Sequence, residues 1–206
     1  MNSFVRNAPP NCLTNIIAGE QIFIRKGRSW KNEYELNGNA NNFSWGTFEY
    51  QSRARLIVNQ LSLVSISHCF YCDAKWVQYG HIKPEIDHYC PKTKRPFKAY
   101  YYPNLFLSCG SCNGYKGNKF SRNLLKFDSP NYSFDDYFFI DFESGKIRVR
   151  TDIPIENRYS ARYTLTVLGI NKDARPETRL EELANFESAA NKELQRYNFR
   201  YFLERC

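Results

Sequence analysis

The chain of 206 residues carries 29 lysine and arginine residues against 21 aspartate and glutamate residues, a formal net charge of +8. This length allows one domain with a sizeable core, and an aromatic content of 17% excludes a disordered chain. The positive charge favours a polyanionic partner, nucleic acid ahead of an anionic membrane surface. No apolar run reaches the roughly 18 residues of a membrane helix, and the first residues lack the apolar region of a signal peptide. We therefore expect a cytoplasmic protein.

The first 66 residues are expected to form an N-terminal flank that ends in a helix. Pro9-Pro10 and the asparagine-rich stretch 37–42 indicate turns and loops, and we expect the isolated Trp30 and Trp45 to pack on the core. Residues 47–66 repeat apolar side chains at intervals typical of an amphipathic helix. We therefore predict a helix over 47–66, just before the first pair of cysteines.

Four of the seven cysteines form two C-x2-C pairs, Cys69 with Cys72 and Cys109 with Cys112. Two such pairs can converge on one tetrahedral Zn²⁺, because each pair presents two sulfur atoms from a tight turn. We predict a structural zinc site, since four thiolates leave no open position for water or substrate. The other three cysteines are expected to be free thiols in a reducing compartment: Cys12, Cys90 and Cys206.

Two short strands and a helix are expected within and after the cysteine pairs. Residues 82–89 fit a strand, which Pro84 restricts to a sheet edge or a strand start, and residues 104–108 are apolar enough for a second strand. The segment that begins at Cys109 has room for a short helix. Two histidines near the cysteines are expected to be surface or hydrogen-bonding residues rather than to replace a cysteine ligand: His68 and His81.

The C-terminal part of the chain, residues 126–206, begins with a predicted β-hairpin. Aromatic and β-branched residues over 137–142 and 146–150 flank a short turn that contains glycine. Residues 155–168 follow Pro154 and precede a glycine, an arrangement typical of a helix.

One long helix is predicted to close the chain. Apolar residues recur every three or four positions from Leu180 to Tyr201, after a helix start at Asp173. This stripe either packs in the core, the interpretation we favour, or binds a partner. Taken together, the elements indicate an α+β protein that folds as a single compact unit.

Polar residues between and after the cysteine pairs follow a recognisable order: Asp87-His88, Asn104 before leucine, and Asn113 with Lys116 after the second pair. With the cysteines, this order and spacing resemble an HNH endonuclease of the zinc-stapled kind. The resemblance implies a ββα-metal core over residues 67–125 that holds one divalent ion. The rest of the chain then forms α-helical N- and C-terminal flanks and an extra β-hairpin.

Three further segments support a finer resemblance: residues 86–92, residues 104–120, and residues 163–171 followed by Arg179. They are similar to the HNH subunit of Septu-type and retron-linked anti-phage systems. This similarity implies a separate ATPase subunit in a hetero-oligomer. The chain has no G-x-x-x-x-G-K-[ST] phosphate loop, so any ATP dependence requires another protein. The long C-terminal helix and the N-terminal segment are the candidate docking surfaces.

The resemblance and the chemistry of phosphodiester hydrolysis assign the same roles. A neutral imidazole can accept a proton from water at cytosolic pH, so His88 is the expected general base. Mg²⁺ or Mn²⁺ prefers oxygen ligands, which Asp87 and Asn113 offer; the family often has histidine in place of Asn113. By analogy, Asn104 is expected to hold the catalytic loop or to orient His88. Neighbours on a regular strand face opposite ways, so the strand must bend or end at His88.

Basic side chains surround the proposed centre and either contact phosphates or form a solvated loop. The expected nucleic-acid contacts are Lys92, Lys94, Arg95, Lys98, Lys116 and Lys119. The leading hypothesis is a metal-dependent DNA endonuclease that acts as the effector of an anti-phage system. Two alternatives remain open: a non-catalytic zinc-knuckle module that binds nucleic acid, and an RNA-cleaving toxin with the same centre.

Overall fold

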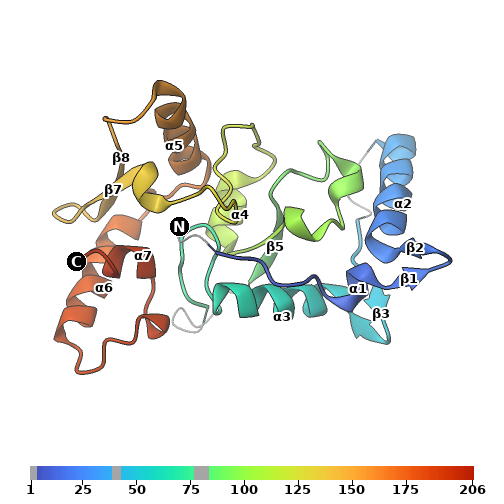
Figure 1. Ribbon diagram of the computed structural model, residues 1–206, viewed down its shortest axis with the longest axis horizontal. Helices are drawn as coiled ribbons and strands as arrows, with labels where there is room; N and C mark the ends of the chain where they lie inside the picture. The colour runs from blue at the N-terminus through green and yellow to red at the C-terminus, as the bar shows by residue number, and fades with distance from the viewer. Residues whose placement is uncertain (1–3, 39–42, 77–83) are drawn as a thin grey trace.

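The computed structural model describes residues 4–38, 43–76 and 84–206. Helices alternate with short strands along an elongated molecule, in which α2 lies at one end and α6 at the other (Figure 1). Within the described residues the strands form four separate two-stranded sheets, and every pair is antiparallel. The fold is therefore mixed, with helices and small sheets. No described helix is long and apolar enough to cross a membrane.

The N-terminal flank contains a 16-residue helix that the sequence analysis did not predict, α2 (Ile22–Asn37). Only Ile22, Gly27 and Trp30 are buried on it, too few to give a helical apolar pattern. A Cβ at Gly27 would lie 2.4 Å from the carbonyl oxygen of Phe97, so glycine lets α2 pack closely on that loop. Before α2 lie three shorter elements: α1 (Asn11–Thr14), β1 (Ile16–Ile17) and β2 (Glu20–Gln21).

The helix predicted over 47–66 begins six residues later than expected, as α3 (Arg53–Ser65). The preceding residues form a hairpin of β3 (Thr47–Phe48) and β4 (Gln51–Ser52), whose turn residues Glu49 and Tyr50 have φ of 48° and 63°. The Ser52 hydroxyl then accepts a hydrogen bond from the Arg55 N–H and caps the helix. A tight turn and a serine cap thus set the start of α3, where the apolar pattern alone did not.

The central strands and helix lie where they were predicted. β5 (Glu85–His88) pairs with β6 (Leu105–Ser108) in a register that places Asp87 opposite Phe106. β6 leads through Cys109 into α4 (Gly110–Lys116), which packs on β5. Two 3₁₀ turns bridge the strands, Pro96–Lys98 and Tyr102–Asn104. These elements place two strands and a helix in the middle of the molecule (Figure 1).

The predicted hairpin and the helix after it are also present. β7 (Phe138–Asp141) pairs with β8 (Lys146–Val149), and α5 (Ile155–Val167) follows Pro154. Gly169, with φ 59°, ends this region, and its missing Cβ leaves space for Tyr115 of α4. The C-terminal part therefore contacts the central unit through α4.

The single long C-terminal helix is a wrong prediction. The chain instead forms α6 (Arg175–Ser188), a 3₁₀ turn at Leu194–Arg196 and the short α7 (Arg200–Leu203). Ala189 is extended, and Phe199 adopts a left-handed φ of 53°. Tertiary contacts override the apolar periodicity here, because all four residues of α7 are buried against the rest of the molecule. The apolar residues of α7 therefore belong to the core and offer no docking face.

Candidate metal centre and hydrolytic site

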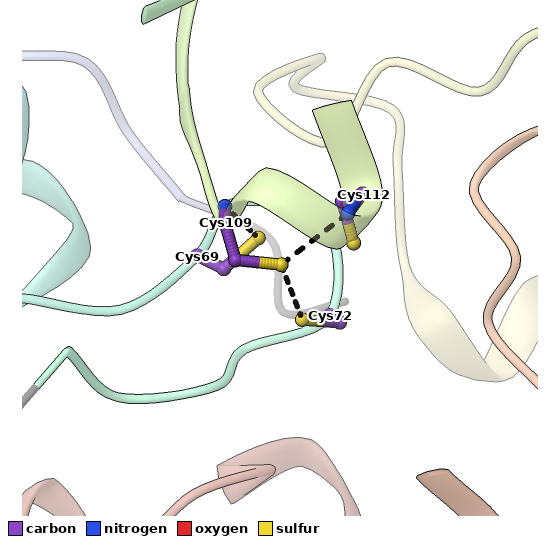
Figure 2. Close-up of side chains that lie close together, drawn as sticks. All are labelled: Cys69, Cys72, Cys109 and Cys112. Carbon is purple, nitrogen blue, oxygen red and sulfur yellow. Dashed lines mark hydrogen bonds between the residues drawn. The ribbon is translucent and has the colours of Figure 1, made fainter. Parts of the chain in front are cut away.

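The four predicted cysteine ligands come together. Their sulfur atoms lie within 4.8 Å of one another, and all four side chains are buried. Cys109 and Cys112 lie at the start of α4 and face Cys69 and Cys72 from the segment after α3 (Figure 2). The Sγ atoms of Cys72 and Cys109 are 3.7 Å apart. A zinc tetrathiolate with bonds of about 2.3 Å requires sulfur atoms about 3.8 Å apart, so the cluster can hold zinc.

The thiols have unequal acidities. Burial raises the pKa of Cys69 and Cys112 well above the ordinary value for a thiol. Hydrogen bonds from neighbouring thiols, that of Cys109 first, hold the pKa of Cys72 well below it. A bound divalent cation stabilises thiolates directly, so this buried group of four suits a metal better than it suits four neutral thiols.

Arg175 at the start of α6 supplies positive charge beside the cysteines. It lines the same small cavity as Cys72 and Cys109. Its Nη1 donates to the carbonyl oxygens of Leu168 and Gly169, at 3.1 and 2.9 Å. Its Nη2, in contrast, is buried without a hydrogen-bond partner within the described part of the chain. A zinc tetrathiolate carries a net negative charge. A guanidinium N–H without another partner beside the cysteines is suited to balance that charge.

The C-terminal segment bonds to residues next to the first cysteine pair, Cys69 and Cys72. The Arg200 guanidinium and its backbone N–H both donate to the carboxylate of Asp73, at 2.5 and 2.7 Å. The buried His68 pairs through Nε2 with the carbonyl oxygen of Tyr197, at 2.9 Å. His68 is therefore a hydrogen-bonding residue, as predicted, and lies outside the cysteine cluster. His81 lies outside the described residues.

A second site lies on the opposite side of α4, as an open cavity of about 450 Å³. Three of the four predicted catalytic residues line it, Asp87, His88 and Asn113, together with Glu85 and the predicted phosphate contact Lys92. β5 ends at His88, as the alternation of side chains required. The structure thus places the proposed base and the proposed oxygen ligands around one space.

His88 has a defined tautomer. Its Nε2 lies 2.8 Å from the carbonyl oxygen of Ala99, and because a carbonyl only accepts, Nε2 carries the proton and Nδ1 the lone pair. Burial lowers the pKa of His88 to about 4, with the hydrogen bond to Ala99 opposing the shift and the charge of Lys92 adding to it. The imidazole is therefore neutral at cytosolic pH, which is the form that accepts a proton.

Asp87 is paired within the protein. The hydroxyl of Tyr71 donates to Oδ2 at 2.5 Å, and the ammonium of Lys116 lies 3.0 Å from Oδ1 and 2.9 Å from Oδ2. Burial and the nearby Asp87 charge raise the pKa of Tyr71 well above its ordinary value, so the phenol remains a donor. A carboxylate offers about four lone-pair sites, so Asp87 retains capacity for a further contact on the cavity side.

The two asparagines of the motif have different positions. Asn113 lies on the cavity wall, and its Nδ2 donates to Oε2 of Glu85 at 2.6 Å. Asn104 is buried behind the cavity: its Nδ2 donates to the carbonyl oxygens of Cys90 and Lys98, and its Oδ1 accepts from the Cys90 N–H. Of the two roles expected for Asn104, loop holding is the one its contacts match.

Five of the six predicted phosphate contacts are exposed or half-buried. Lys94 and Arg95 are exposed on the loop after β5, and Lys119 is exposed after α4. The half-buried Lys92 lies over the ring of Phe43, 5.0 Å from its centroid. Lys98 is also half-buried.

Lys116 requires a correction. Its side chain is fully buried, and its ammonium bonds the Asp87 carboxylate and the carbonyl oxygen of His88, at 2.7 Å. A phosphate cannot reach this group, so Lys116 stabilises the site from inside the fold. The sequence placed Lys116 in a cluster of basic residues, but on α4 its side chain faces β5 and is buried. The prediction that Lys116 contacts phosphates is therefore wrong.

Sequence reasoning missed several residues around the two centres. Trp45 stacks on His88, and Phe43 meets the same imidazole edge-to-face at 5.4 Å. Neither contact has a local signal, because more than forty positions separate the partners in the sequence. Glu85 did have one: it stands two residues before Asp87, and residues i and i+2 of a strand share a face.

No protein-family model matches this chain, and no curated protein matches it either.

Proposed function

We propose that this chain is a metal-dependent HNH endonuclease that hydrolyses phosphodiester bonds of DNA. One observation carries the proposal: a histidine whose Nδ1 carries the lone pair, a carboxylate and an amide line one cavity in a ββα unit beside a tetracysteine cluster. A zinc module that only binds nucleic acid needs no such cavity. The order of Asp87, His88, Asn104 and Asn113 along the chain agrees with the HNH resemblance.

The four cysteines would hold Zn²⁺ as a structural ion. Their four thiolates fill a tetrahedral site, so this ion takes no part in hydrolysis. It fixes the start of α4 to the segment before β5, and thereby fixes Asn113 relative to Asp87 and His88. A unit with so small a core of its own needs such a support.

Asp87 and Asn113 would hold Mg²⁺ or Mn²⁺ in the cavity, because both offer the oxygen atoms that hard cations prefer. When bound, the ion neutralises charge on the scissile phosphate and stabilises the leaving oxygen. His88 accepts the proton of the attacking water at Nδ1. The Ala99 carbonyl oxygen accepts a hydrogen bond from Nε2 of His88, so it stabilises the imidazolium that forms and keeps the ring in place. Asn104 holds the loop that carries this carbonyl.

The exposed and half-buried basic residues near the site would bind the DNA backbone. Lys92 lies on the cavity wall, and four more basic residues lie on the segments that follow β5 and α4: Lys94, Arg95, Lys98 and Lys119. Such contacts are insensitive to base sequence. We therefore propose weak sequence preference.

The proposed role in anti-phage defence and the proposed ATPase partner rest on the Septu-like resemblance, and the cytoplasmic location is a further proposal that rests on the sequence. The surface of the N-terminal flank supports a docking role, since three apolar side chains of β1 and α2 are exposed: Ile16, Ile17 and Ile24. Contiguous exposed apolar surface is typical of protein contact sites, and these three side chains come from a span of nine residues. Co-purification of the natively expressed complex, followed by mass measurement, tests the presence of the ATPase.

Cleavage of plasmid DNA and of RNA in Mg²⁺ or Mn²⁺ separates the three candidate functions. A DNA endonuclease nicks or linearises the plasmid with added metal and stops when that metal is chelated under conditions that retain zinc. An RNA-cleaving toxin with the same centre cuts RNA and leaves the plasmid intact. A binding module shifts both nucleic acids in a gel and cuts neither, and that result would contradict the proposal.

A further inference from the structure

The charges around the cavity do not suit a divalent cation if Asp87 is the only carboxylate. Lys116 is fully buried against Asp87, and together the two groups carry no net charge. Lys92 adds a positive charge on the cavity wall. The net charge of these three groups, Asp87, Lys116 and Lys92, is therefore +1. A net positive charge repels a cation, and the repulsion is strongest where water is partly excluded.

Glu85 changes this balance. It lies on the same face of β5 as Asp87, two residues earlier, and its side chain lines the same cavity. Its carboxylate has no lysine or arginine partner within the described residues, and its contact is the amide of Asn113. A second carboxylate brings the four groups to neutrality before any cation binds.

The contact between Glu85 and Asn113 also fixes the direction of the amide. A carboxylate only accepts hydrogen bonds, so the Asn113 nitrogen must face Glu85, at 2.6 Å from Oε2. The amide oxygen then points away from Glu85. That oxygen is the atom that a hard cation prefers.

We propose that Glu85 is a functional member of the cation site: it provides the carboxylate charge that no lysine neutralises and holds the Asn113 amide with its oxygen free for the ion. The inference rests on the proposed function, which places the ion beside Asp87 and Asn113. Glu85 acts on the ion through charge and through Asn113, and it takes no proton in the reaction.

Binding of Mn²⁺ to the zinc-loaded chain tests this role without DNA. Titration followed by electron paramagnetic resonance gives the free Mn²⁺ concentration and hence the dissociation constant. Glu85→Gln keeps an oxygen that can accept from Asn113 but removes the charge, and we expect it to weaken Mn²⁺ binding about tenfold or more. Glu85→Asp keeps the charge and should restore most of the affinity. Glu143→Gln, on the β7–β8 turn, is the matched control and should bind like the wild type.

Three outcomes bear on the inference. Weaker binding by Glu85→Gln, with one zinc per chain and an unchanged circular dichroism spectrum, supports it. Equal Mn²⁺ affinity of Glu85→Gln and the wild type overturns the role of Glu85 and leaves the endonuclease proposal intact. A wild-type chain that binds no Mn²⁺ and cuts no DNA overturns the proposed function itself.

Discussion

The imidazole of His88 lies parallel to the indole of Trp45, with ring centroids 5.5 Å apart and an angle of 1° between the planes. Trp45 belongs to the N-terminal flank, so a segment outside the ββα unit covers one face of the proposed base. This cover contributes to the burial that lowers the pKa of His88 to about 4. An imidazole shielded in this way stays neutral across the range in which an unperturbed histidine gains a proton, near pH 6.5.

Replacement of Trp45 by alanine should therefore raise the pKa of His88 from about 4 toward its ordinary value. Water then reaches the ring and stabilises the imidazolium, which burial now disfavours. The pKa is measured by NMR titration of the histidine Cε1 protons in zinc-loaded protein, with His88→Gln to assign the signal. Tyr159→Ala, an exposed aromatic on α5, should leave the titration unchanged. A His88 pKa that stays near 4 in Trp45→Ala would show that the indole does not protect the base.

Lys116→Met should strongly destabilise the fold, because it leaves the Asp87 carboxylate buried without its cation. Loss of one partner of a buried ion pair costs about 3–5 kcal/mol of unfolding free energy, which urea denaturation measures. Lys119→Met, three residues further on and exposed, should match the wild type in stability. The double variant Asp87→Asn with Lys116→Met should recover part of the loss. A small effect of Lys116→Met alone would mean that the buried pair is not what holds α4 on β5.

Arg175→Gln should weaken zinc retention, although Arg175 does not line the cavity at His88. The substitution removes the guanidinium beside the cysteine cluster, and outer partners of metal sites typically change affinity by about 10- to 100-fold. Competition with a chromophoric chelator measures zinc release from the folded protein. Arg175→Lys retains the charge and should release zinc more slowly than Arg175→Gln. If all three proteins release zinc at the same rate, Arg175 has no part in balancing the charge of the sulfur atoms.

The basic segment after β5, with Lys94 and Arg95 exposed and Lys98 half-buried, should account for much of the salt dependence of DNA binding. Each lost phosphate contact lowers the slope of log affinity against log salt by about 0.9. The triple variant of Lys94, Arg95 and Lys98 to alanine should therefore bind with a slope smaller by about 2 to 3, as fluorescence anisotropy measures. Lys146→Ala on β8 is the control at a distance from the cavity. An unchanged slope in the triple variant would make this loop a solvated surface.

Local signals in the sequence predicted the central elements well. Residues 82–89 fit a strand and residues 104–108 are apolar enough for a second one, and β5 (Glu85–His88) and β6 (Leu105–Ser108) lie within these ranges. The second C-x2-C pair starts a helix that brings Asn113 to the cavity. The cysteine spacing alone was enough to predict the cluster, because a C-x2-C turn brings its two sulfur atoms close together within four residues. The hairpin at Gly145 and the helix after Pro154 depend on short-range turn chemistry and were predicted for the same reason.

Long-range contacts decided the features that the sequence did not reveal. Arg200 bonds Asp73 across more than a hundred residues, and this pair draws the C-terminus back onto the cysteine turn where the apolar stripe predicted a continuous helix. The burial of Lys116 depends likewise on Asp87 and Tyr71, which come from separate segments. Side chains whose partners lie far away in the sequence give no periodic signal. The cluster of basic residues therefore led to the wrong prediction of a phosphate contact at Lys116, and the apolar stripe to the wrong prediction of a long C-terminal helix.

In the proposed reaction, His88 activates water for phosphodiester hydrolysis in a site held by zinc. The most direct test of this role is Mn²⁺-dependent plasmid cleavage by zinc-loaded wild type and by His88→Ala, at equal concentration and equal zinc content. We predict that His88→Ala keeps its zinc, its DNA affinity and its spectrum but loses roughly 10²- to 10⁴-fold in cleavage rate. Cleavage by His88→Ala at the wild-type rate would show that His88 is not the general base.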